Sequence, residues 1–118
     1  EEARRLLGEG PLEKYNAATM TDPKQVLSEC QRFRSQGFSL SAANFDPDVK
    51  SVAAPIFDAD GRVFATLALA APMIRAHDSA TIENGRLVCA AAMEATKAFA
   101  GDVPGWYAQI VTSLDKAA

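Results

Sequence analysis

Apolar and polar positions change their spacing several times along the chain, and each change predicts a different element. From position 21 onward the pattern is helical: Asp22 can cap the free amides, Pro23 suits the first turn, and Gly37 suits a left-handed final residue. The apolar positions of this segment recur at helical spacing: Val26, Leu27, Cys30 and Phe33. We therefore expect a helix over 21–37 and a shorter one over 1–7.

The middle of the chain has the alternation that is typical of strands. The segment FSLSAANF, from Phe38, alternates apolar with small polar residues and predicts the first strand. The runs VKSVAAPIF (49–57) and RVFATLALA (62–70) flank a DADG turn, in which Gly61 supplies a positive φ, so we expect an antiparallel hairpin. Pro55 cannot donate a ladder hydrogen bond and marks a sheet edge, a non-bonded position or a bulge.

Two further helices are expected after the strands. Asp78 or Ser79 can cap a long helix that continues to about Phe99. Its buried side is expected to consist mostly of small residues: Ile82, Val88, Ala91, Ala92, Ala95 and Ala98. The last helix is amphipathic and carries Trp106 and Tyr107. Such a helix either covers the core or makes a subunit contact, and we favour the contact.

The order of these elements predicts an α+β fold, with an antiparallel sheet covered by helices. Both edges of so small a sheet are open unless a partner or further chain completes them. The length of 118 residues suits one domain, which we divide into 1–101 and a C-terminal helical extension over 102–118. The first residues read as an element already under way, which suggests a piece of a longer chain.

Composition argues against several classes of protein. The net charge is −3, from 12 basic and 15 acidic residues, and we find no basic stripe that would bind nucleic acid. No apolar run approaches the roughly 20 residues of a membrane helix, and we see no signal peptide. Cys30 and Cys89 share no metal-ligand spacing with the single histidine, His77. We expect reduced thiols in the cytoplasm and no metal or other cofactor.

Catalytic chemistry finds little support in the sequence. His77 and Asp78 could serve acid–base chemistry with Cys89 or a serine as nucleophile, but the spacing matches no activated-nucleophile pattern. Residues 58–61 resemble the start of a calcium loop and lack the later acidic ligand. We expect Asp78 to serve as a helix cap beside a solvated His77 imidazole, a turn at 58–61, and no enzyme.

The second strand of the hairpin carries alanines where larger side chains would pack better. Ala68 and Ala70 either form the floor of a pocket or receive the alanine-rich helix that follows. Ser41 and Ser51 need hydrogen-bond partners if they are buried, and a backbone carbonyl or a ligand can be that partner.

The two interpretations differ in the register that they require. A regular three-residue loop with a glycine bulge would pair Phe57 with Val63 and would place Ser51 on the opposite face from Ala68. A two-residue loop, or a bulge near Pro55, would return both side chains to one face. A pocket shared by the two strands therefore predicts an irregularity in this hairpin.

Several motifs follow one another in a particular order. They are the TDPKQVL helix with its arginine-bearing segment from Arg32 to Phe38, then VKSVAAPIFD, then DGRV, then a small-residue strand ending in Pro72 and Arg75. Together they cover about residues 1–100 and resemble the effector-binding domain of IclR-family transcriptional regulators. The resemblance implies a GAF-like or profilin-like fold, present in part. The family's winged helix and the first portion of its sensor have no counterpart in this sequence.

The resemblance also implies a function. Members bind a small effector, often an organic or aromatic acid, assemble as dimers and tetramers, and contact DNA only through the winged helix. The family's ligand-facing positions fall here at Ser41, Val49, Ser51, Ala68 and Ala70. Members that bind small hydroxylated or keto acids have more polar residues at several of these positions, so we expect a ligand with an apolar or aromatic body and one acidic group. The alternative is a GAF-like dimerisation or interaction module without a small-molecule ligand.

Overall fold

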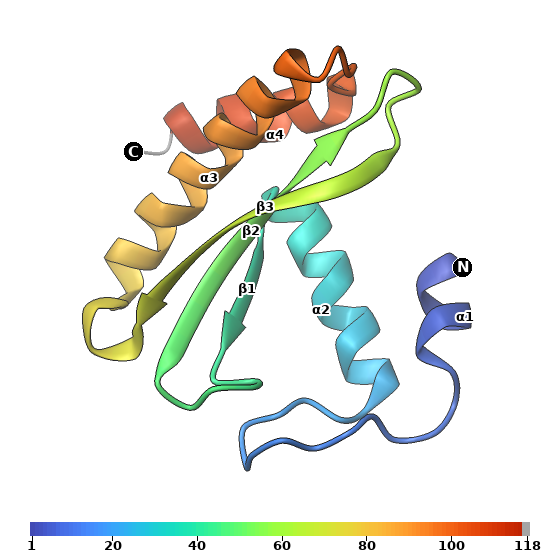
Figure 1. Ribbon diagram of the computed structural model, residues 1–118, viewed down its shortest axis with the longest axis vertical. Coiled ribbons are helices and arrows are strands. Elements are labelled where there is room, and N and C mark those ends of the chain that lie inside the picture. Colours follow the sequence, from blue (N-terminus) through green and yellow to red (C-terminus); the bar gives the residue numbers. More distant parts are fainter. Residues whose placement is uncertain (117–118) are drawn as a thin grey trace.

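The computed structural model describes residues 1–116 and has the expected α+β architecture (Figure 1). One antiparallel sheet contains β1 (Ser39–Ala42), β2 (Val49–Phe57) and β3 (Val63–Pro72), in that spatial order. The helices are α1 (Glu2–Leu7), α2 (Pro23–Gln36), α3 (Asp78–Ala98) and α4 (Gly105–Lys116), with a short 3₁₀ turn η1 (Met73–Arg75) before α3. Figure 1 shows α3 on one side of the strands and α2 on the other.

Helix α2 begins and ends as its sequence predicts. The Asp22 carboxylate accepts a hydrogen bond from the Lys24 amide at 3.0 Å, and Gly37 closes the helix with a left-handed φ of 94°. The apolar stripe of α2 is only partly covered, because no residue of this helix is fully buried and Cys30 is exposed. Space therefore remains between α2 and the sheet.

Helix α3 differs from its prediction at its cap. His77, rather than Asp78 or Ser79, caps the helix: its Nδ1 accepts a hydrogen bond from the Ala80 amide at 3.3 Å. An imidazole nitrogen can replace the usual oxygen because the free amides of the first turn need only an acceptor.

The buried face of α3 also differs from the prediction, although Val88 and Ala92 are buried as expected. Ile82, Ala91 and Ala98 are exposed, and the core-facing stripe instead includes residues that an apolar count overlooks: Thr81, Gly85, Cys89 and Thr96. Thr96 is fully buried because its hydroxyl donates to the Ala92 carbonyl and accepts from the Phe57 amide.

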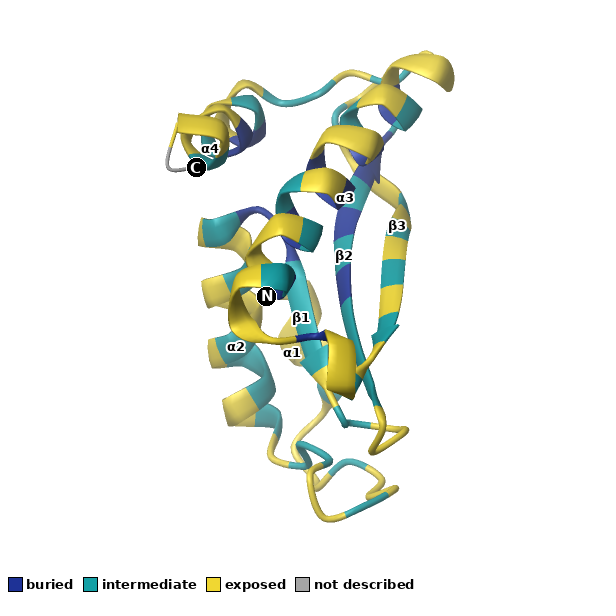
Figure 2. Cartoon of the chain, turned by 90° about the vertical axis from the view of Figure 1, so that its left-hand side faces the viewer, coloured by how far each residue is buried: buried dark blue, intermediate teal, exposed yellow. Residues whose placement is uncertain are grey.

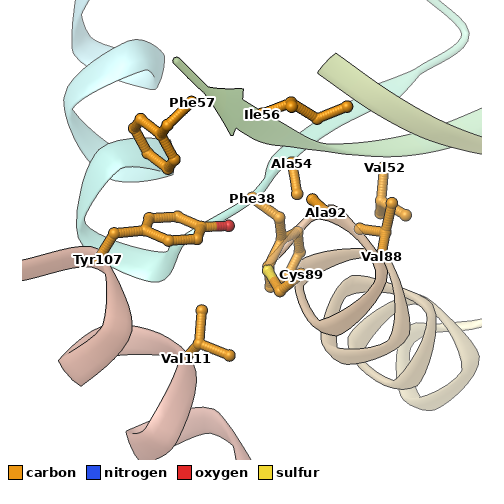
Figure 3. Close-up of a cluster of buried hydrophobic side chains, with 10 residues drawn as sticks. All are labelled: Phe38, Val52, Ala54, Ile56, Phe57, Val88, Cys89, Ala92, Tyr107 and Val111. Carbon is orange, nitrogen blue, oxygen red and sulfur yellow. The ribbon is translucent and has the colours of Figure 1, made fainter. Parts of the chain in front are cut away.

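The core lies between α3 and one face of the sheet (Figure 3). Val52, Ala54 and Ile56 of β2 point toward α3 and are almost fully buried. Figure 2 shows the result as dark blue positions along β2, whereas β3 alternates between half-buried and exposed residues. Within residues 1–116, no helix is long and apolar enough to cross a membrane.

Helix α4 covers the end of the same core that lies next to Gly37 and Phe38, just before β1. Tyr107 is 1% exposed, its hydroxyl donates to the Gly37 carbonyl at 2.8 Å, and its ring meets the Phe57 ring edge-on at 5.2 Å. The helix is therefore a cover for the core, and our preference for a subunit contact is wrong for the face that carries Tyr107 and Val111. The division of the chain at residue 101 stays a prediction.

Candidate functional site

The ladder places all five predicted ligand-facing residues on one face of the sheet. Ser41 of β1 lies directly opposite Ser51 of β2, and Ser51 lies opposite Ala70 of β3. Residues opposite each other point to the same face, as do residues two apart in a strand, so Val49 and Ala68 share this face. We call it the uncovered face, because α3 packs on the other one.

The predicted irregularity in the hairpin is present and explains this alignment. Phe57 pairs with Val63, but the next pair joins Ile56 to Ala65, so β3 has one residue, Phe64, more than β2 between these pairs. If the ladder continued regularly from the Phe57–Val63 pair, with Phe64 opposite Ile56, then Ser51 would lie opposite Leu69 of the core face rather than opposite Ala70. The sequence-based expectation of a bulge is confirmed.

The alternative role for the two alanines, as a seat for the following helix, is wrong. Ala68 and Ala70 are both exposed, and α3 packs instead against the face that carries Leu67 and Leu69. The reason is the alternation of β3: small residues occupy one face and leucines occupy the other. The alanines leave open space above the sheet.

The two serines of the uncovered face differ in their hydrogen bonding. The Ser41 hydroxyl accepts a hydrogen bond from the Asn44 side-chain amide nitrogen at 3.1 Å, and the Asn44 side-chain oxygen Oδ1 in turn accepts from the Met20 backbone amide. The half-buried Ser51 hydroxyl has no hydrogen-bond partner among residues 1–116. Its donor and acceptor capacity is available to a ligand.

A hollow of about 520 Å³ borders the uncovered face at β1, between α2 and residues 12–20. Ser41 opens onto it, and most of its remaining walls are apolar or aromatic: Leu12, Tyr15, Met20, Val26, Phe33 and Phe45. Val49, Ser51, Ala68 and Ala70 lie outside it, on the open sheet. The structure therefore unites the five positions on a face but encloses only the first.

Residues 12–20 form the outer wall of this hollow, and sequence reasoning missed them. The Asn16 side-chain amide donates to the Ala43 carbonyl at 2.8 Å, and the Thr19 hydroxyl donates to the Asn44 carbonyl at 2.6 Å. The segment has no helical or strand periodicity, so its attachment to the β1–β2 turn rests on these long-range hydrogen bonds. Asn16 and Thr19 were the available signal, since both residue types often bond to nearby backbone.

The candidate metal-ligating and nucleophilic residues His77 and Cys89 lie apart from one another in the described part of the chain. Residues 1–116 contain no group of three or more acidic, histidine or cysteine side chains placed to hold a metal ion. Cys89 lies in the core, where burial raises the pKa of its thiol, and a protonated buried thiol is a poor nucleophile. His77 is exposed and acts as the α3 cap.

Comparison with known proteins relates the chain to bacterial transcriptional regulators. Residues 1–96 match the family described as "Bacterial transcriptional regulator IclR C-terminal". The chain is 31% identical over 91 residues to the HTH-type transcriptional regulator BhcR of Paracoccus denitrificans. The aligned region covers 77% of this chain and 33% of that protein. The relatives are transcriptional regulators rather than enzymes. The chain spans 33% to 37% of the length of the curated relatives that it matches first.

Solved structures agree with this result. An IclR-type transcriptional regulator from Silicibacter superposes with a TM-score of 0.80 at 30% identity, over 88% of this chain and 41% of that one. A double mutant of the inducer-binding domain of PobR from Acinetobacter, solved in complex with 3-hydroxybenzoic acid, superposes with a TM-score of 0.66 at 23% identity, over 73% of this chain and 50% of that one. The second likeness shows the fold alone, which is the GAF-like fold of these regulators.

Proposed function

We propose a function on the premise that the chain belongs to the C-terminal domain family of bacterial IclR transcriptional regulators. The uncovered sheet face contributes to the binding of a small organic acid. The observation that carries the proposal is the aligned row of Ser41, Ser51 and Ala70, with a free hydroxyl at its centre. The attached DNA-binding part of a longer, cytoplasmic regulator would respond to this binding.

The side chains around the row favour a ligand with an apolar or aromatic body and one acidic group. Val49, Ala68 and Ala70 offer only methyl groups, while Ser41 and Ser51 can donate hydrogen bonds to a carboxylate. The adjoining hollow is lined mainly by apolar and aromatic side chains. The 3-hydroxybenzoic acid in the complex of the PobR double mutant belongs to this class of ligand.

Regulation would follow from a shift between quaternary arrangements. We propose that the domain assembles as dimers or tetramers and that the effector binds one arrangement more tightly than another. A ligand can move such an equilibrium only by the difference between its two affinities. The spacing of the DNA-binding domains would change with the arrangement.

Isothermal titration calorimetry with a panel of aliphatic and aromatic carboxylic acids tests the proposal. We expect at least one acid to bind, Ser51→Ala to weaken it by about tenfold through loss of a charge-assisted hydrogen bond, and Ala70→Leu to block it sterically. Ser113→Ala, on the exposed side of α4, is the matched control. Absence of binding by every acid, or equal affinity in wild type and both sheet variants, would overturn the proposal.

One observation favours the alternative of an interaction module. Phe64 and Phe99 meet edge-on at 5.9 Å and are 53% and 68% exposed, so the hairpin end carries a solvent-facing aromatic pair. Size-exclusion chromatography together with the calorimetric titrations separates the two functions, because both involve self-association: self-association without binding of any acid would favour the module.

A further inference from the structure

A second, smaller hollow lies farther along the uncovered face, where α2 ends and α4 begins. Its volume is about 190 Å³, and its walls include Phe33, Arg34, Ala53, Pro55, Thr66 and Trp106. Pockets for drug-sized ligands measure about 300 to 1,000 Å³. This hollow therefore suits a ligand of few heavy atoms.

Arg34 gives this hollow a cationic rim. Its guanidinium carbon lies 4.4 Å from the centre of the Trp106 ring. Among residues 1–116, no carboxylate pairs with Arg34, whereas Arg32 two positions earlier pairs with Glu29. Stacking occupies the flat face of a guanidinium and leaves its in-plane N–H groups free, and those groups bind carboxylates in a bidentate manner.

The remaining walls are mostly apolar. Pro55 and Ala53 project from the uncovered face of β2 and Phe33 projects from α2, so the floor beside the guanidinium offers hydrocarbon contacts. Thr66 adds one hydroxyl from β3. A cation beside an apolar floor matches a ligand that joins one carboxylate to a flat apolar body.

We propose that this hollow is a second binding site, which holds a small monocarboxylate on Arg34 with its flat body against Pro55, Phe33 and Trp106. The site does not depend on the proposed effector function. Pro55 and Ser51 lie four positions apart in β2, about 13 Å at the usual strand rise, so one small acid cannot reach both. Phe33 borders both hollows, but Arg34 lines only this one and Ser51 lies outside it, so a change at either residue can remove one site without the other.

The chain contains a single tryptophan, Trp106, so its fluorescence reports on this site. Sodium benzoate, titrated into the 118-residue chain at constant ionic strength, is expected to give a saturable change with a Kd of about 1 mM, as suits a small and open site. Arg34→Gln should weaken binding by at least about tenfold, and Arg34→Lys should restore only part of it. Arg32→Gln, on the same helix and outside the hollow, should bind as the wild type does.

Benzyl alcohol, Ser51→Ala and an NMR measurement separate the possible outcomes. Benzyl alcohol should bind far more weakly than benzoate, Ser51→Ala should leave the fluorescence titration unchanged, and the Trp106 indole ¹H–¹⁵N signal should shift with benzoate. A non-saturating response, equal binding of the alcohol, or an unchanged Kd in Arg34→Gln would overturn the second site. Loss of the response in Ser51→Ala would also overturn it, because the signal would then come from the sheet face.

Discussion

The carbonyl oxygen of Gly37 is the meeting point of two side chains from distant parts of the chain. The Tyr107 hydroxyl donates to it at 2.8 Å, and the Cys89 thiol lies 3.3 Å from it. Both donors lie in the core, where burial raises their pKa values. Neither contact was predictable from the sequence, because Tyr107 and Gly37 are 70 positions apart and no local pattern links them.

These two groups predict a loss of stability at alkaline pH. In the unfolded chain the pKa is about 8.5 for cysteine and about 10 for tyrosine. Both folded values are higher, so the contribution is fully present below the unfolded pKa values. Above them, the unfolded state releases its protons first, and the free energy of unfolding falls by up to about 1.4 kcal/mol per pH unit for each group.

Urea unfolding between about pH 8 and pH 11 measures this decline. In Tyr107→Phe we expect a shallower slope above about pH 10, together with a loss of about 1 kcal/mol at neutral pH from the missing hydrogen bond. Tyr15→Phe is the matched control, since the Tyr15 hydroxyl bonds to Glu13 on the surface. Identical slopes for the wild type and Tyr107→Phe would contradict the assignment.

Elements with strong local signals were predicted well. The hairpin followed from alternation around the DADG turn, and α2 followed from Asp22, Pro23 and Gly37, each of which acts through its own backbone chemistry. The buried face of α3 was predicted poorly, because Thr96 and Gly85 are buried for reasons that hydropathy does not record. Thr96 satisfies two hydrogen bonds there, and Gly85 makes room for a ring.

Gly85 therefore yields a prediction at the scale of one helix. A Cβ at this position would lie 2.6 Å from Cε1 of the buried Phe38 ring. Alanine gains up to about 1 kcal/mol in helix propensity over glycine, whereas overpacking a core costs about 1 to 3 kcal/mol. We expect Gly85→Ala to lower the free energy of unfolding by about 1 kcal/mol, measured by urea denaturation.

Gly105→Ala is the control for this helix variant. Gly105 begins α4, and a Cβ there meets no heavy atom within 4 Å. We expect this change to be neutral or slightly stabilising. If Gly85→Ala proved as stable as Gly105→Ala, the close packing of Phe38 on α3 would be wrong.

Across the whole molecule, the two terminal helices contribute very differently. Helix α1 buries no residue, whereas α4 buries Tyr107 and Val111. Removal of residues 1–10 should change the free energy of unfolding by less than about 1 kcal/mol. Removal of residues 102–118 should cost about 5 kcal/mol, which is comparable to the entire stability of many domains.

Near-ultraviolet circular dichroism and urea denaturation of the two shortened chains compare these contributions. We expect the chain without 1–10 to keep a cooperative transition and the chain without 102–118 to lose its fixed aromatic signal. A cooperative transition of undiminished midpoint without 102–118 would mean that α4 is dispensable, and would favour the boundary at residue 101 that we predicted from the sequence.

The candidate site was predictable in part. Five positions on one face followed from the resemblance, and the bulge followed from requiring a common face for Ser51 and Ala68. The outer wall over residues 12–20 and the hollow beside Arg34 were not predictable. Both arise from contacts between segments that only the folded chain brings together, such as Asn16 with Ala43 and Arg34 with Trp106.

The extra residue in β3 determines which changes in length the hairpin can accept. Phe57 pairs with Val63 before it and Ile56 pairs with Ala65 after it, so a chain that lacked Phe64 would join two stretches of ladder whose faces already agree. Deletion of Thr66 has the opposite effect, because the rest of the strand would turn over and direct Leu67 and Leu69 away from the core. Loss of one residue at position 64 therefore keeps the same side chains on each face of the sheet, whereas loss of one residue at position 66 exchanges the two faces.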